Sequence, residues 1–159
     1  MDTADKSTSR VDSAGDVLSG KLKDLLAQKE KGVIQVDSDC IVAAAARKMR
    51  DNKVGALMVL ENDTLVGIFT ERDLMSRVVA AGLDPEKAQV SEAMTSSIAT
   101  VPPETSIREA ANIMSQNRIR HLPVLQDGKL YGVISTGDIL AWKLREQEFT
   151  LHQLGDYFF

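Results

Sequence analysis

Two copies of one α/β unit, each with the order β-α-β-β-α, account for most of this sequence. Three observations predict the architecture: the chain aligns with itself, its apolar spacing changes between helical and strand-like in the same order in both copies, and 43% of its residues are apolar although only 4% are aromatic. Because a unit of about fifty residues buries too little surface to be stable alone, the copies are expected to pack about a pseudo-two-fold through their sheets.

The repeat is found by shifting the chain by 65 residues. This shift places residues 36–74 on residues 101–139 without a gap, and eleven of the 39 aligned positions are identical. The identities include Gly67 with Gly132 and Asp73 with Asp138. Such regularity predicts two copies of one supersecondary unit.

Each copy begins with an extended apolar stretch followed by a helix. The stretches are residues 33–36 and 98–101, and each helix presents an apolar face at helical spacing. Ser106 followed by Glu109 forms a capping box, which places the start of the second helix. The apolar faces consist of Ile41, Val42, Ala45, Ala46 and Met49 in the first copy and Ile107, Ala110, Ala111 and Met114 in the second.

A hairpin and a closing helix complete each copy. Short apolar runs on either side of turn residues predict one hairpin from residues 57–60 and 65–69 and another from residues 122–125 and 130–134. The apolar faces of the closing helices consist of Leu74, Met75, Val78 and Val79 in the first copy and Ile139, Leu140 and Leu144 in the second.

Five segments follow from this division. They are a flexible, polar N-terminal tail (1–20), the first repeat with a leading helix (21–81), a linker (82–95), the second repeat (96–147) and an aromatic C-terminal extension (148–159). The leading helix, residues 18–28, is expected to pack near a dimer seam. The extension either covers the chain's own core or forms an interface, and we favour the interface.

Composition excludes several classes of protein. With 19 basic and 23 acidic residues the net charge is −4, the wrong balance for binding duplex nucleic acid. A single cysteine, Cys40, excludes an internal disulfide. No apolar run approaches the roughly 18 residues of a membrane span. Without a recognisable targeting segment, the expected compartment is the cytoplasm.

The strongest chemical signal is the doubled strand-to-helix junction, Gly67-Ile68-Phe69-Thr70-Glu71-Arg72-Asp73 and its copy Gly132-Val133-Ile134-Ser135-Thr136-Gly137-Asp138. A hydroxyl beside the free N–H groups of a helix start can help to hold a phosphate, and a carboxylate three residues later can accept hydrogen bonds from a ribose diol. Helix capping explains the same residues, since Thr and Ser are good N-caps and an acidic third residue complements the dipole.

The doubled junction, together with Arg120-His121-Leu122-Pro123-Val124 and the segment 90–95, resembles the tandem CBS domain pair, or Bateman module, and most closely its small stand-alone members. The resemblance covers about residues 21–146. It implies a regulatory module without catalytic residues or a metal, usually homodimeric, which binds AMP, ADP, ATP, NAD or S-adenosylmethionine between the repeats and signals by a change of shape to another protein.

Carried over by motif, the resemblance implies two pseudo-equivalent sites. Asp73 and Asp138 would accept hydrogen bonds from ribose, and Thr70 and Ser135 would lie on the phosphate or sugar side. The remaining expected ligand-binding residues are Cys40, Gly55, Ala56, Ile68, Arg72, Thr105, Arg120, His121, Leu122, Pro123 and Val133.

The copies differ in where they carry positive charge. Arg72 aligns with Gly137, whereas Arg120 and His121 align with Gly55 and Ala56. We therefore expect Arg72, Arg120 and His121 to converge on one set of phosphates, so that one site is tighter than the other.

The sequence thus predicts a cytoplasmic, homodimeric sensor of an adenosine-containing ligand. One alternative is a scaffold whose clefts no longer bind a ligand. A nucleotide hydrolase is a weaker alternative, because no base, nucleophile or metal cluster accompanies the two aspartates, and nucleic-acid binding is the weakest.

Overall fold

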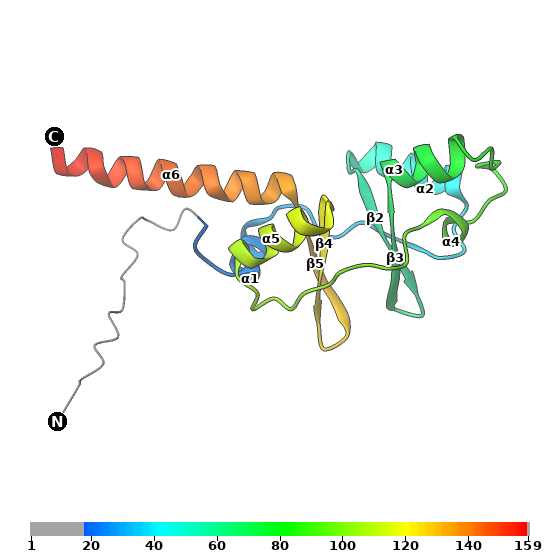
Figure 1. Cartoon of the computed structure of the whole chain (residues 1–159), viewed down its shortest axis with the longest axis horizontal. Coiled ribbons are helices and arrows are strands. Elements are labelled where there is room, and N and C mark those ends of the chain that lie inside the picture. The colour runs from blue at the N-terminus through cyan, green and yellow to red at the C-terminus, as the bar shows by residue number, and fades with distance from the viewer. Residues whose placement is uncertain (1–17, 159) are drawn as a thin grey trace, which may run out of the picture.

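The computed structural model describes residues 18–158, and the elements follow the predicted order in the first copy and, apart from its first strand, in the second (Figure 1). The predicted flexible tail lies outside the described residues except for its last three positions. Those residues contact the second half of the chain, where the Trp142 indole N–H donates to the Ser19 carbonyl at 2.9 Å.

The first repeat is a three-stranded sheet with two helices. Strand β1 is parallel to β2, which is antiparallel to β3. Asn62 and Asp63 form the hairpin turn with φ of 49° and 62°, which is the two-residue type that matches strand twist. The elements are β1 (Gln35–Asp37), α2 (Val42–Asn52), β2 (Ala56–Glu61), β3 (Thr64–Thr70), α3 (Glu71–Asp73) and its π-helical continuation η1 (Leu74–Val79).

The second repeat has the same hairpin, but its first strand is missing. Residues 98–101 make one bridge, between Val101 and Val124, so the predicted strand there is wrong. In the first repeat the Ser38 N–H donates to the Leu60 carbonyl at the end of the first strand. The equivalent residue of the second repeat is Pro103, which has no N–H to donate. The elements are α5 (Ile107–Asn117), β4 (His121–Gln126), β5 (Lys129–Ser135) and α6 (Thr136–Phe158).

The leading helix α1 (Leu22–Gln28) precedes the first repeat in the chain but packs on the second. Leu22 and Leu25 are buried in one cluster with Ile107, Leu122 and Ile134. The segment 82–95 is more than a spacer, because α4 (Val90–Ala93) within it is buried in the core of the first repeat.

A third cluster joins the two repeats. Ala56, Met58 and Ile68 of the first sheet are buried against Leu130 and Val133 of the second. This contact confirms that the repeats pack through their sheets, and it brings the start of β2 close to the end of β5. The helices α2, α3, α5 and α6 lie along one side of the molecule, and the hairpin tips point to the other (Figure 1).

A glycine at the same position of each repeat allows another segment of the chain to lie directly on the sheet. A Cβ at Gly67 would lie 2.5 Å from the Met94 sulfur and 3.0 Å from the Thr95 carbonyl oxygen. At the equivalent Gly132, a Cβ would lie 2.8 Å from the methyl groups of Leu26. The shared glycine therefore reflects close packing in both repeats.

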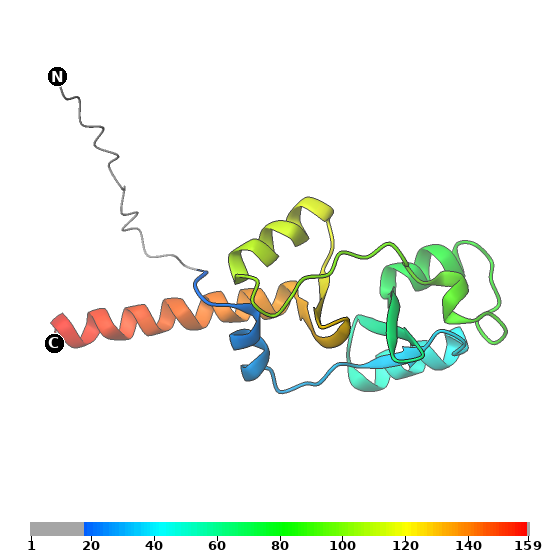
Figure 2. The same cartoon turned by 90° about the horizontal axis from the view of Figure 1, so that it is seen from below.

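Most of the predicted apolar faces of the closing helices are exposed. Val78 is buried, whereas Met75, Val79, Leu140 and Leu144 are 61%, 72%, 57% and 51% exposed. Because the exposed pairs Met75/Leu140 and Val79/Leu144 are equivalent in the repeat, the exposure is systematic. The predicted C-terminal extension continues the closing helix, because α6 runs to Phe158 and projects beyond the second repeat (Figure 2).

Candidate functional site

A cavity of about 540 Å³ lies between the two repeats. Three segments far apart in the sequence meet around it: the segment between α1 and β1, the start of β2, and the junction of β5 with α6. Of the residues expected to bind a ligand, six line this cavity: Gly55, Ala56, His121, Val133, Ser135 and Asp138.

Asp138 is held at this junction by its own helix start and by a lysine from the far end of the chain. Its Oδ2 accepts hydrogen bonds from the Ser135 N–H at 2.8 Å and from Lys29 Nζ at 2.9 Å, and its own N–H donates to Ser135 Oγ. Lys29 Nζ also donates to the Val133 carbonyl at 2.9 Å. The bonds from Lys29 and from the Ser135 N–H both end at Oδ2.

The Asp138 carboxylate is kept ionised by these partners. Burial alone would raise its pKa, but hydrogen bonds from Lys29 and Ser135 outweigh burial and hold the pKa below the ordinary value. An ionised carboxylate in a cleft is a strong acceptor for sugar hydroxyls.

His121 faces the same cavity from β4, paired with Ser135 across the hairpin. Burial, and then the positive charge of Lys29, lower its pKa below the ordinary value. The imidazole is therefore neutral at pH 7 and offers one donor and one acceptor rather than a fixed positive charge.

Three lysines that the sequence analysis did not single out supply the positive charge. Lys29, Lys31 and Lys53 all line the cavity, and Asp138 is the single acidic residue among the residues that line it. Lys53 ends α2 in the left-handed conformation, as Arg118 does at the equivalent end of α5. This shared position at a helix end was the available sequence signal, whereas Lys29 and Lys31 lie before the aligned repeat.

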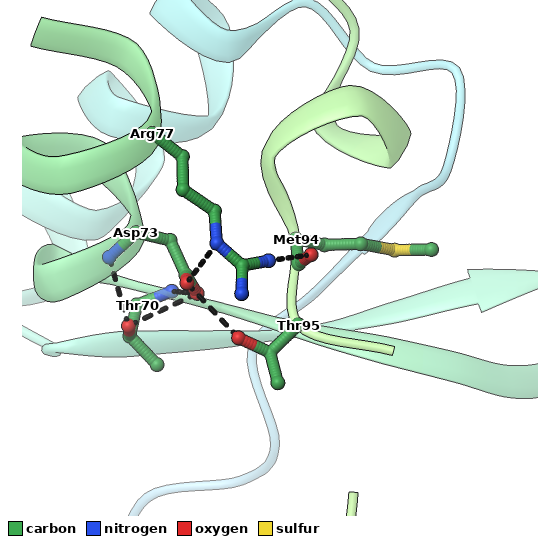
Figure 3. A network of polar contacts seen from close by, with 5 residues as sticks. All are labelled: Thr70, Asp73, Arg77, Met94 and Thr95. Carbon is green, nitrogen blue, oxygen red and sulfur yellow. Dashed lines mark hydrogen bonds and ion pairs between the residues drawn. The ribbon is translucent and has the colours of Figure 1, made fainter. Parts of the chain in front are cut away.

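The equivalent aspartate of the first repeat, Asp73, is closed off (Figure 3). Its Oδ2 accepts from the Thr70 N–H at 2.9 Å and the Thr70 hydroxyl at 3.0 Å, and its Oδ1 accepts from the Thr95 hydroxyl at 2.9 Å. Arg77 covers the group, with Nε 3.8 Å from Oδ1 and a hydrogen bond to the Met94 carbonyl. Asp73 is only 5% exposed.

Backbone pairing fixes this closure. Thr95 and Ile68 exchange N–H···O bonds of 2.9 Å in both directions, so the segment after α4 is fastened to the edge of β3. The Thr95 hydroxyl therefore lies where a ribose hydroxyl would otherwise reach Asp73.

The expected convergence of Arg72, Arg120 and His121 is not present. Arg72 is exposed on α3, and Arg120 lines a different cavity of about 520 Å³ between α5 and α6. Of the three, only His121 lines the cavity between the repeats. The β3–α3 junction and the start of β4 therefore do not direct both arginines to one place.

The remaining expected ligand residues lie in the cores or at helix starts. Leu122 is fully buried and Pro123 is buried in β4, Thr105 is buried before α5, and Ile68 belongs to the cluster between the sheets. Cys40 is half-buried, and burial raises the pKa of its thiol, so it is protonated at neutral pH.

Among residues 18–158 the structure contains no group of three or more metal-ligating side chains. In the same part of the chain, no helix combines the length and apolar character of a membrane span.

Comparison with known proteins identifies the repeat unit. The CBS domain family model matches twice, at residues 23–80 and 90–145. The CBS domain-containing protein CBSX3 of Arabidopsis thaliana, named as mitochondrial, is 35% identical over 125 residues, which are 76% of this chain and 61% of that protein. The chain thus spans less than two thirds of that relative.

Solved structures agree with the match. A CBS-domain protein of Agrobacterium tumefaciens superposes with a TM-score of 0.72 at 35% identity, over 77% of this chain and 98% of that one. The hexameric CBS-CP12 protein of bloom-forming cyanobacteria has a TM-score of 0.68 at 32% identity, over 77% of this chain and 67% of that one. The two matched regions of the family model overlap the two repeats.

Proposed function

The chain belongs to the CBS-domain family, and from that premise we propose that it is a regulatory module that binds one adenine nucleotide per chain, in the cavity at Asp138. The contrast between the two aspartates supports this proposal. Asp138 lines a cavity of about 540 Å³ and accepts from Lys29 and the Ser135 N–H at Oδ2, whereas the buried Asp73 is hydrogen-bonded at both oxygens.

The cavity offers a separate environment for each part of a nucleotide. Val33, Ile34, Met58 and Val133 supply apolar walls suited to a base. Asp138 is the acceptor for the ribose hydroxyls. The phosphates then lie toward the lysines, which neutralise them.

Charge favours a nucleotide with two or three phosphates. Three lysines and one carboxylate line the cavity, and the carboxylate is already paired with Lys29. We expect ATP and ADP to bind more tightly than AMP, and adenosine more weakly still. S-adenosylmethionine, which carries a positive sulfonium group and lacks phosphate, is disfavoured by the same lysines.

Binding would act by shifting the population of one arrangement of the repeats. The cavity takes residues from both sheets and from the segment between α1 and β1, so a ligand contacts parts of the chain that can move relative to one another. A partner protein, whose identity the sequence does not indicate, would bind one arrangement of the repeats in preference to the other. Catalysis is not required, because the neutral His121 and the paired Asp138 perform binding roles.

The same repeat symmetry supports self-association. Met75, Val79, Leu140 and Leu144 are exposed apolar side chains at equivalent positions of both repeats, and we call them the exposed apolar set. A homodimer formed through it would bury side chains that otherwise face water.

Isothermal titration calorimetry on the whole chain tests the proposal. The panel consists of adenosine, AMP, ADP, ATP, NAD and S-adenosylmethionine. One ATP per chain and an affinity that rises with phosphate number are expected. A ligand at one hundred times its Kd should also stabilise the fold by about 2.7 kcal/mol.

Three outcomes would contradict the proposal. Two equal sites per chain would show that Asp73 is open in solution. Absence of binding by every member of the panel would indicate the scaffold alternative. Conversion of ATP to ADP with multiple turnovers, followed by chromatography, would indicate an enzyme.

The cytoplasm remains our proposed compartment. Since one relative is named as mitochondrial, localisation of the tagged full-length chain decides between the two.

A further inference from the structure

One face of α6 carries a regular apolar spacing that is left exposed by the part of the chain that the structure describes. Leu140, Leu144 and Leu151 follow one another at steps of four and seven residues, with Gln147 between them at the intervening position. This is the alternating spacing of four and three that forms the seam of a two-stranded coiled coil. Leu140, Leu144 and Leu151 are 57%, 51% and 69% exposed.

The opposite face of α6 is where the helix meets its own chain. The Trp142 indole N–H donates to the Ser19 carbonyl, and the Glu146 carboxylate accepts from the Ser19 hydroxyl and N–H. At 100° per residue, Trp142 and Glu146 lie on the side of the helix away from the seam. The seam face of α6 is thus left for another molecule.

A helix that projects without packing is only marginally stable in water. Residues 136–158 form one helix, and its outer part extends past the rest of the molecule (Figures 1 and 2). Isolated helices of this size draw most of their stability from burial of an apolar face. The seam therefore needs a partner helix of matching length and spacing.

Charge identifies that partner as a second copy of α6. When Leu140 and Leu144 occupy the two seam positions, Lys143 and Glu148 flank the seam on opposite sides. In a parallel pair of identical helices, residues five apart on these flanks face each other across the seam. Each Lys143 then meets the Glu148 of the other chain, which gives two opposite-charge pairs.

The direction of α6 agrees with a parallel pair. The helix runs along the long axis of the molecule, continuing the line from the first repeat through the second (Figure 1). A two-fold axis parallel to that line places the two α6 helices side by side and pointing the same way. The opposite, head-to-tail dimer would send them to opposite ends and leave both seams exposed.

We propose that α6 forms a parallel two-stranded coiled coil with α6 of a second copy, and that this seam selects the head-to-head homodimer, first repeat beside first repeat and second beside second. The inference rests on the self-association proposed above and adds its orientation. Gln147, a polar residue within an apolar seam, would fix the register.

Cysteine cross-linking tests the orientation directly. In a Cys40→Ser background, Leu151→Cys places a thiol in the seam, and Phe149→Cys places one on the opposite face at similar exposure, 65% against 69%. Under mild oxidation we expect Leu151→Cys to form a disulfide-linked dimer and Phe149→Cys to remain unlinked. The native mass of each variant is measured by light scattering in parallel.

The outcomes separate the two levels of the proposal. A dimer in which Leu151→Cys does not cross-link overturns the head-to-head seam and leaves the self-association standing. A monomeric mass overturns both. Equal cross-linking of the two cysteines would show random collision and would also overturn the seam.

A charge exchange gives a second, independent readout. Lys143→Glu places two like charges opposite each other and should weaken the dimer about tenfold. The double variant Lys143→Glu/Glu148→Lys restores opposite charges and should recover most of the loss. Failure of the second change to rescue the first would contradict the register.

Discussion

The two repeats contain the same aspartate at the same strand-to-helix junction, yet they surround it differently. Asp138 is paired with Lys29 through one oxygen and faces a cavity, whereas Asp73 accepts three hydrogen bonds from Thr70 and Thr95 and is nearly sealed. The junctions themselves cap their helices in the same way, since Ser135 and Thr70 each accept from the aspartate N–H.

The difference comes from two segments that each precede one repeat in the chain but pack on the other: Thr95, ahead of the second repeat, seals Asp73, and Lys29, ahead of the first repeat, reaches Asp138. The 65-residue shift aligns Lys29 with Met94 and Glu30 with Thr95. In the first repeat the short Thr95 side chain donates a hydrogen bond to the second oxygen of the Asp73 carboxylate. In the second repeat the long Lys29 side chain pairs with Asp138, which still lines the cavity. A repeated motif therefore becomes a structural cap or a candidate ligand site according to its neighbours.

Exchange of each carboxylate for an amide should give the largest effect. Asp138→Asn removes the charged acceptor for ribose, so ATP affinity should fall by about 2 kcal/mol, or roughly thirtyfold. Asp73→Asn should leave ATP affinity unchanged and lower the free energy of unfolding by about 1–3 kcal/mol, because its amide N–H₂ would face donors. Calorimetry and urea unfolding measure the two effects. Equal losses of affinity would erase the distinction between the sites.

Removal of the hydroxyl that seals Asp73 should affect stability alone. Thr95→Val keeps the shape but leaves Oδ1 of a buried carboxylate without its 2.9 Å donor. The free energy of unfolding should fall by about 1–2 kcal/mol. Thr100→Val, at an exposed position of the same connecting segment, is the matched control. A change in ATP stoichiometry from one to two would show that this hydroxyl is what closes the first site.

The lysines should affect phosphate recognition and not the base or the sugar. Lys31→Gln/Lys53→Gln is expected to weaken ATP binding about fivefold at low salt, with adenosine unchanged, because exposed charge pairs each contribute up to about 1 kcal/mol. Lys87→Gln, whose side chain is 86% exposed on the linker, is the control for net charge. The difference should shrink as ionic strength rises. An equal loss for adenosine would argue that the lysines shape the cavity instead.

The smallest expected effect is a pH dependence through His121. Its pKa is lowered by burial and by Lys29, while Asp138 and Glu71 oppose that effect and Arg120 adds to it. Arrival of phosphate raises the pKa of His121, so the complex takes up a proton and ATP affinity should increase a few-fold as pH falls from 8 to 6. In the His121→Asn variant the dependence of ATP affinity on pH should be flatter than in the wild-type protein. An identical pH profile in both would remove His121 from the phosphate region.

The helices and hairpins of both repeats could largely be predicted from the sequence because they depend on the local spacing of apolar and turn residues. The predicted helix start at Ser106 is confirmed by the bond that its hydroxyl accepts from the Glu109 N–H at 3.1 Å. Both hairpins form where the apolar runs predicted them. Apolar spacing predicts a first strand in the second repeat that does not form, because Pro102 and Pro103 have no N–H to donate to a neighbouring strand.

The sequence by itself determined the repeat, the family and the pair of aspartates, since identity at fixed spacing and hydrophobic period are properties of the linear chain. Only the tertiary structure decided that Asp138 is open and Asp73 sealed, that Lys29, Lys31 and Lys53 gather in one cavity, and that α1 belongs to the core of the second repeat. These arrangements depend on contacts between residues up to about a hundred positions apart, such as Lys29 with Asp138, and no local periodicity encodes such contacts.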